Sequence, residues 1–169
     1  MTAAITASAE LAESPRAVFE FLADLRNHAL LAPGSVELRS RDSGAEAPTQ
    51  ALVRLRGPLA IRRTASTAIV EASAPAVIRG RASIGKRTRA SISWTLASRR
   101  DHTAVTLRVT VQDTGFFDRV LLRLGGQGWL ERRFADALVC LADQFAPAAV
   151  PHTCTGEGLS LRPALQPAA

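Results

Sequence analysis

The spacing of hydrophobic residues changes along the chain from alternation to helical spacing and back to alternation. Residues 3–12 alternate, with apolar side chains on one face, which predicts a first strand. Residues 13–25 have helical spacing, and Ser14 and Pro15 suit the cap and the first position of a helix. A second short helix follows and ends at Pro33-Gly34. The first part of the pattern is therefore one strand and two short helices.

From residue 36 to residue 113 the alternation predicts six more strands, separated by turn-forming residues such as Gly, Pro and Asp. The strands span residues 36–42, 49–57, 59–72, 76–84, 86–100 and 103–113. In the last two, apolar side chains occupy one face and Ser, Thr and Arg the other, as in an antiparallel sheet with one face in water. The third of these strands fits less well, because Arg63 and Glu71 fall on its more apolar face. A β-bulge would restore the alternation.

A long helix, residues 113–145, closes the pattern, but Gly125, Gly126 and Gly128 interrupt it. Each glycine in a helix interior costs about 1 kcal/mol relative to alanine. The apolar stripes before and after the glycines are rotated relative to one another, so we expect a kink, a bulge or a break there. The glycines either permit close packing of helix on sheet or separate two helices, or they widen a cavity and form its entrance beside Trp129.

This order of elements predicts one α+β domain over residues 1–146. We expect a curved antiparallel β-sheet of about seven strands, wrapped around a long C-terminal α-helix, with two short helices after the first strand. Residues 147–169 are rich in Pro and Ala and lack periodicity, so we predict a disordered tail.

Two stretches carry a resemblance to a known superfamily. The first is "ITASAELAESPRAVFEFLADLRNHALLAPGSVELRS"; the second is "HTAVTLRVTVQDTG" with the long helix that contains Leu141, Ala142 and Phe145. Over residues 3–146 this layout resembles the helix-grip fold of the START, Bet v 1 and polyketide cyclase (SRPBCC) superfamily. The segments "APGSVEL" and "LLRLGG" look most similar to the branch of proteins that resemble the G-type subunit of carbon monoxide dehydrogenase.

The resemblance implies an apolar pocket between the sheet and the last helix. Relatives hold lipids, sterols, quinones, polyketides or plant hormones there; some are cyclases, and others are assembly or recruitment factors. We therefore expect a carrier or sensor of a hydrophobic or amphipathic small molecule. The expected ligand-binding residues are Phe21, His28, Leu31, Ile92, Trp94, Leu107, Val109, Leu121, Leu124 and Gly128.

An enzyme of the polyketide cyclase or dehydratase type is a less favoured alternative. His28 could act as an acid or base, and Glu131 could do so if the helix continues past the glycines. An enzyme would need His28, Glu131 or an inward arginine such as Arg63 to converge inside the cavity. The chain has no tyrosine to hold a ligand carbonyl. His, Cys and carboxylate spacing predicts no metal site and no cofactor.

Charge suggests a third function, recruitment or maturation of another component. The net charge is +6, and 12 Arg or Lys lie between Arg54 and Arg108 against only Glu71 and Asp101. Alternation puts several of them on the polar sheet face: Arg79, Arg81, Arg87, Arg89 and Arg108. Such a face would attract an acidic protein or an anionic membrane, or it is simply solvated. Nucleic acid is disfavoured, because no aromatic residues are interleaved to stack on bases.

Composition and segment pattern suggest a location. The chain is 47% apolar, as in ordinary globular proteins, and no apolar run approaches the roughly 20 residues of a membrane span. The first residues lack the charged and apolar regions of a signal peptide. All but one of the basic residues are arginine, which suggests a GC-rich genome. We expect a cytoplasmic bacterial protein, and the oligomeric state stays open.

Overall fold

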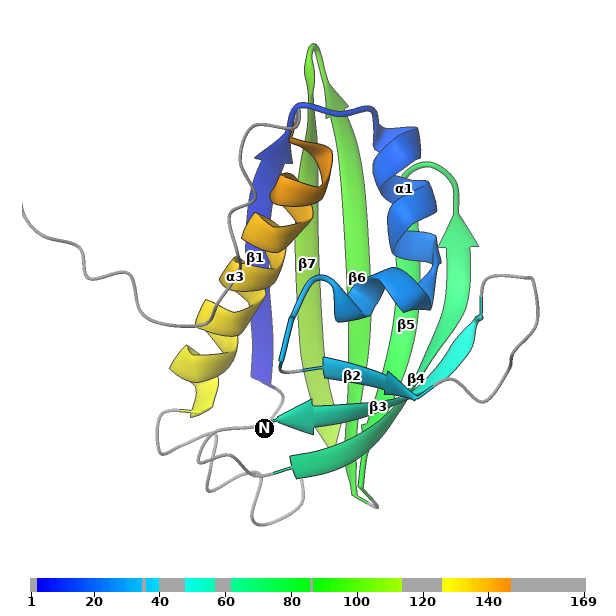
Figure 1. Cartoon of the computed structure of the whole chain (residues 1–169), viewed down its shortest axis with the longest axis vertical. Helices are drawn as coiled ribbons and strands as arrows, with labels where there is room; N and C mark the ends of the chain where they lie inside the picture. The colour runs from blue at the N-terminus through cyan, green and yellow to red at the C-terminus, as the bar shows by residue number, and fades with distance from the viewer. Residues whose placement is uncertain are drawn as a thin grey trace, which may run out of the picture.

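The computed structural model describes residues 3–34, 36–39, 48–56, 62–85, 87–113 and 126–146 (Figure 1). The predicted strand and two short helices are β1 (Ala3–Leu11), α1 (Pro15–Ala23) and the 3-10 helix η1 (Leu25–Ala29). The six further strands are β2 (Val36–Arg39), β3 (Gln50–Arg56), β4 (Arg62–Ser73), β5 (Val77–Ile84), β6 (Thr88–Arg99) and β7 (His102–Asp113). The last described element is α3 (Gln127–Phe145). The order of these elements is the predicted one.

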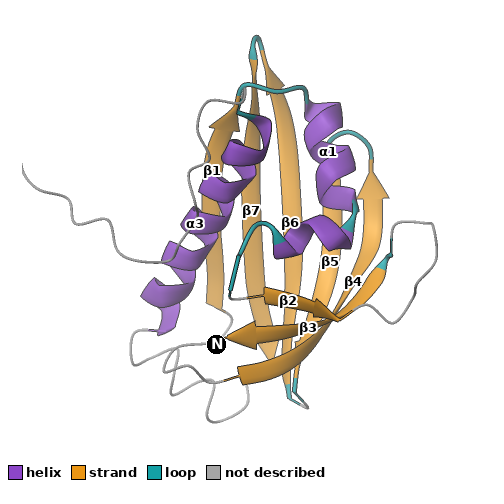
Figure 2. Ribbon diagram, in the orientation of Figure 1, coloured by secondary structure: helices purple, strands orange, loops and turns teal. Residues whose placement is uncertain are grey.

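The seven strands form one antiparallel sheet in the order β1-β7-β6-β5-β4-β3-β2. The sheet curls, so that β2 and β3 cross its lower end at a steep angle to β1, β7 and β6 (Figure 1). Helices α1, η1 and α3 all lie on the concave face (Figure 2). The convex face is the one that points away from the helices. The predicted α+β helix-grip architecture is confirmed.

The start of α1 follows from its first two residues. The side chain of Ser14 accepts a hydrogen bond from the amide of Ala17 at 3.3 Å, and Pro15 occupies the first helical position. A proline is tolerated there because the first amides of a helix have no intrahelical acceptor. Val18 and Leu22 on the inner face of α1 are fully buried against the sheet. Both predicted roles, the Ser14 cap and Pro15 at the first position, are confirmed.

The predicted bulge lies in β4, between Ile69 and Glu71. The extra residue reverses the alternation, so Ile69 points to the concave face while Glu71 pairs with Arg79 on the convex face, with the carboxylate oxygen 2.7 Å from the guanidinium. Gly80 lies opposite Ile69, and a Cβ there would stand 3.0 Å from the carbonyl oxygen of Ala68. The close approach of β4 therefore favours a glycine on the neighbouring strand.

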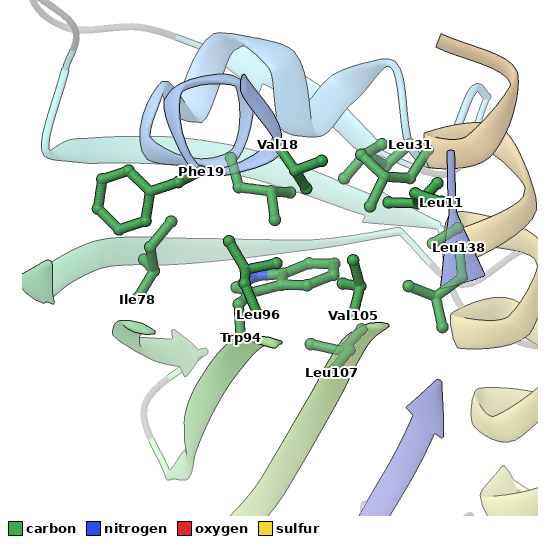
Figure 3. Close-up of a cluster of buried hydrophobic side chains, with 13 residues drawn as sticks. Leu11, Val18, Phe19, Leu31, Ile78, Trp94, Leu96, Val105, Leu107 and Leu138 are labelled. Atoms are coloured by element: carbon green, nitrogen blue, oxygen red, sulfur yellow. The ribbon is translucent and has the colours of Figure 1, made fainter. Parts of the chain in front are cut away.

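The hydrophobic core lies between the helices and the upper half of the concave face. Trp94 is in the middle of this cluster, with side chains from α1 above it (Figure 3). The buried members are Leu11, Val18, Phe19, Leu22, Leu31, Ile78, Trp94, Leu96, Val105, Leu107, Ala137, Leu138 and Leu141. Burial of these side chains holds α1 and α3 against the sheet.

Helix α3 confirms the C-terminal part of the predicted long helix. Its inner side buries Leu138 and Leu141 and packs mainly beside β1 (Figure 2). Residues 114–125, where the predicted kink begins, and the predicted tail, residues 147–169, lie outside the described residues. Among the described helices, none has the length and apolarity needed to cross a membrane.

Candidate functional site

A row of half-buried residues crosses the middle of the concave face. Strand register places Ile69, Gly80, Ile92 and Val109 side by side on β4, β5, β6 and β7. None of the four is fully exposed and none is fully buried. Gly80 contributes no side chain to the row, because the backbone of β4 approaches it closely. An apolar surface that stays partly exposed in this position is available for contact with another molecule.

The neighbouring row of residues on the concave face, nearer the helices, is buried. Ile78, Trp94 and Leu107 are aligned across β5, β6 and β7, and each is at most 5% exposed. Leu31, in the loop after η1, is also buried. The sequence predicts Trp94, Leu107 and Leu31 as ligand-binding residues, whereas the structure places them in the packed core that supports the half-buried row.

Three aromatic side chains from the helices add to the half-buried surface. Phe21 of α1 and Phe134 and Phe145 of α3 are partly buried and pack against the core. The rings of Phe21 and Phe145 meet edge to face, with centroids 5.5 Å apart, and so connect the two helices. We call the half-buried residues Phe21, Ile69, Ile92, Val109, Phe134 and Phe145 the apolar rim.

His28 lies beside this surface on η1. Its Nε2 is 2.8 Å from the carbonyl oxygen of Leu22, and its ring meets that of Trp94 edge to face, with centroids 6.3 Å apart. Because a carbonyl only accepts, Nε2 carries the proton and donates it. Burial lowers the pKa of His28 below its ordinary value of 6.5, against the opposing effects of the Leu22 hydrogen bond and of Asp24. The imidazole is therefore neutral at pH 7, with Nδ1 as an acceptor.

The contacts of His28 also have a structural role. Asn27 donates from its side-chain amide to the carbonyl oxygen of Phe21 at 2.9 Å, and His28 donates to Leu22. Both carbonyls belong to the last turn of α1, where no intrahelical donor is available. Asp24 accepts from the amide of Arg26 at 2.9 Å and starts η1. These bonds fix η1 against the end of α1.

Asp24 remains ionised in this arrangement. The Arg26 guanidinium lies 2.7 Å from its carboxylate, and their hydrogen bonds lower the pKa of Asp24 below its ordinary value. The pair is partly exposed, so it adds little to stability. Its consequence for the site is a fixed negative charge on the loop that carries His28.

The structure does not bring the two candidate catalytic residues into one described contact. Glu131 has an exposed side chain on α3, whereas His28 is half-buried at η1. Arg63 is half-buried on the same face as Ala65, near the lower end of the sheet. In the described part of the chain, no three His, Cys, Asp or Glu side chains gather where they could hold a metal ion.

The described glycine of α3 is not there for close packing. A Cβ at Gly128 would have no heavy atom within 4 Å, so the space beside it is open. Helix α3 begins just before this residue, with Gly126 at its N-cap. The predicted ligand residues Leu121 and Leu124 lie outside the described residues.

Sequence reasoning missed three members of the apolar rim. Phe134 and Phe145 belong to the apolar stripe of the long helix, so the helical spacing could have identified them. Ile69 could not be assigned, because its direction depends on where the bulge interrupts β4.

The convex face carries the predicted basic residues. Arg79, Arg81, Arg87 and Arg89 are all exposed, as is Arg108. Arg79 pairs with Glu71, whereas the other four have no ion-pair partner among the described residues. Short Ser and Thr side chains separate the arginines across the strands. This face is basic, polar and without aromatic residues among the described positions.

No family model matches the chain, and no curated protein matches it. Several solved structures are similar. A START superfamily protein from Mycobacterium smegmatis matches with a TM-score of 0.64 and 14% identity, over 83% of this chain and 97% of its own. TTHA0849 from Thermus thermophilus matches with a TM-score of 0.62 and 16% identity, over 85% of this chain and 97% of its own. DynU16, from the dynemicin biosynthetic locus, matches with a TM-score of 0.55 and 14% identity, over 82% and 45%.

At such low sequence identities, the similarity to these structures shows the fold alone. The similarity to the G-type subunit of carbon monoxide dehydrogenase stays a prediction, because none of these three structures bears on that branch. The seven-stranded curled sheet, the helices on its concave face and the matches over most of the chain agree with the first prediction: this protein has the START/Bet v 1-like helix-grip fold.

Proposed function

We propose that this protein binds a hydrophobic or amphipathic small molecule, such as a lipid, a quinone or a polyketide-like compound. The ligand would lie between the concave face and helices α1 and α3. The observation that supports this site is the apolar rim, six large apolar side chains that stay half-buried beside a sealed core. Binding would remove their remaining apolar surface from water, which is favourable.

His28 supplies a polar group for an amphipathic ligand. In the neutral imidazole, Nδ1 is the acceptor, while Nε2 donates to the carbonyl oxygen of Leu22. A ligand hydroxyl could donate to Nδ1 while its apolar part lies against Ile92 and Val109. One polar contact beside a large apolar surface is typical of small-molecule sites.

A carrier or sensor in the cytoplasm fits this site better than a cyclase or dehydratase. Acid–base catalysis needs groups that converge on the substrate. Glu131 is exposed on α3, which does not support a second acid–base group beside His28.

The first test is native mass spectrometry of freshly purified protein, followed by organic extraction of any bound molecule. We expect a discrete added mass that disappears on denaturation and an extract that contains an apolar compound. A chain that keeps its apo mass after incubation with a mixture of lipids and quinones would contradict the proposal.

A matched pair of variants locates the ligand. Val109→Thr adds a hydroxyl to the apolar rim without a change in shape, and Val70→Thr makes the same change at a strand position that is 54% exposed. An uncompensated hydroxyl costs about 1–3 kcal/mol, so affinity should fall by roughly tenfold in the first variant only. Equal affinities in both variants would place the ligand elsewhere.

A second function, recruitment of an acidic protein or an anionic membrane, is supported by the convex face. Arg81, Arg87 and Arg89 are exposed without an ion-pair partner among the described residues. Charge reversal at these positions and at Arg79 should abolish association with anionic vesicles or an acidic partner. The association of the original protein should weaken as salt is raised. Unchanged association after charge reversal would exclude this function.

A further inference from the structure

We propose that three arginines at the β2–β3–β4 end of the convex face form a binding site for a phosphate group. The site is a shallow depression lined by Gly34, Glu37, Arg54, Arg56 and Arg62. It lies on the opposite face of the sheet from the apolar rim, so it is independent of the small-molecule site proposed above.

Strand register gathers the three guanidiniums. Arg54 and Arg56 are two residues apart on β3, so both point to the convex face. Arg62 is directly opposite Arg56 on β4, and Glu37 is directly opposite Arg54 on β2. Three strands therefore contribute charged side chains to one depression.

The charges in the depression do not balance. The nearest oxygen of Glu37 is 3.9 Å from Nη1 of Arg54, and both side chains are substantially exposed, so this pair is weak. Arg56 and Arg62 have no ion-pair partner among the described residues. Like charges directly opposite on neighbouring strands are unfavourable. Three cations and one anion leave a charge of +2, which a dianion would neutralise.

The chemistry of the lining selects the kind of dianion. Guanidinium groups form paired hydrogen bonds with phosphate oxygens. Gly34 has a φ of +72°, and no heavy atom lies within 4 Å of the position of a Cβ, so this side of the depression is unobstructed. No aromatic side chain is among the described residues that line the site, so it offers no surface for a nucleobase. A phosphate group, free or on a small molecule or lipid, satisfies these conditions.

The test is a titration with inorganic phosphate at constant ionic strength, in which the NMR chemical shifts of the backbone amides are measured at each step. We expect saturable shifts at Gly34, Arg54 and Arg62. The variant Arg56→Gln/Arg62→Gln should bind phosphate at least about tenfold more weakly. The control Arg81→Gln/Arg89→Gln removes the same charge from the same face outside the depression, and should bind like the original protein. Equal weakening in both variants, or shifts that chloride reproduces, would overturn the proposal.

Thermal unfolding gives a second measurement. Phosphate should raise the Tm of the original protein and of the control, but not that of Arg56→Gln/Arg62→Gln. In phosphate-free buffer the variant Arg56→Gln/Arg62→Gln should be at least as stable as the original protein, because it lacks the two like charges that lie opposite one another. If it does not fold, Arg62→Gln alone serves, and a phosphate-induced rise in its Tm equal to that of the original protein would contradict the site.

Two arms distinguish the source of the phosphate. One uses inorganic phosphate, and the other uses phosphatidylcholine vesicles that contain phosphatidic acid. Saturation by inorganic phosphate supports a soluble ligand, and binding to these vesicles that depends on Arg56 and Arg62 supports a lipid headgroup. If neither probe depends on these arginines, the proposal is wrong.

Discussion

The rings of Phe21 and Phe145 meet edge to face, with their planes at 69° and their centroids 5.5 Å apart. One ring comes from α1 and the other from the last residue of α3, so two residues far apart in the sequence join the two helices above the concave face. Edge-to-face packing is favourable because the positive edge of one ring meets the negative face of the other. Both rings remain partly exposed, as members of the apolar rim.

Phe145→Ala should lower the free energy of unfolding by about 2 kcal/mol, since it removes a partly buried ring and its aromatic contact. Urea denaturation measures this loss. A double-mutant cycle with Phe21→Leu and Phe145→Leu should give a coupling energy of about 0.5–1.5 kcal/mol. Strict additivity of the two leucine variants would mean that the ring contact contributes nothing beyond apolar burial.

His28 should make stability depend on pH. Its pKa in the folded protein is below the ordinary 6.5 because burial disfavours the charged ring. The unfolded chain therefore binds a proton that the folded protein does not, and stability falls as pH decreases through about 6.5 toward the folded pKa. Above that range both states are neutral at this residue and it has no effect.

His28→Gln keeps a side-chain donor for Leu22 but does not titrate, so its Tm should vary less between neutral and mildly acidic pH. His102→Gln is the control, since His102 is exposed at the start of β7. An NMR titration of the original protein should give a pKa for His28 below 6.5. A pKa at or above that value would contradict the proposed burial effect.

Gly80→Ala should destabilise the protein by about 1–3 kcal/mol, because its Cβ would press against the carbonyl oxygen of Ala68 and the bulged strand would have to move. Chemical denaturation measures the effect. A variant as stable as the original protein would show that β4 shifts at little cost.

Gly128→Ala should have the opposite effect. The space around its Cβ is open, and alanine favours the helix, so the free energy of unfolding should rise by up to about 1 kcal/mol. Chemical denaturation again measures the effect, and Gly128→Ala is the matched control for Gly80→Ala. Destabilisation by this variant would indicate that position 128 is closely packed.

Alternation and capping predicted most of the fold. The strand alternation of β6 and β7 identified the concave face, because one face of an antiparallel sheet must be buried. Ser14 and Pro15 identified the start of α1, because their chemistry meets the needs of a helix end. Even the bulge in β4 could be predicted, because Glu71 falls on the apolar face without it; Arg63, before the bulge, remains on the concave face.

The candidate site depended on distances that no local pattern contains. The sequence predicts Phe21, Ile92, Trp94 and Leu107 alike as ligand residues, and spacing cannot separate the half-buried Phe21 and Ile92 from Trp94 and Leu107, which are buried in the core. All four belong to apolar faces; exposure depends on which part of the sheet the helices cover. The position of Arg62 directly opposite Arg56 could not be predicted either, because it depends on the register between β3 and β4.

The sequence by itself determined the elements, their order and the apolar face of each, since these follow from local backbone preferences and from the need to bury apolar side chains. Only the tertiary structure decided which apolar residues stay half-buried and which charges meet. Those properties arise when α1 and α3 cover part of the concave face and when strands distant in sequence come into register. Partial exposure is a property of the packed molecule, and no single segment encodes it.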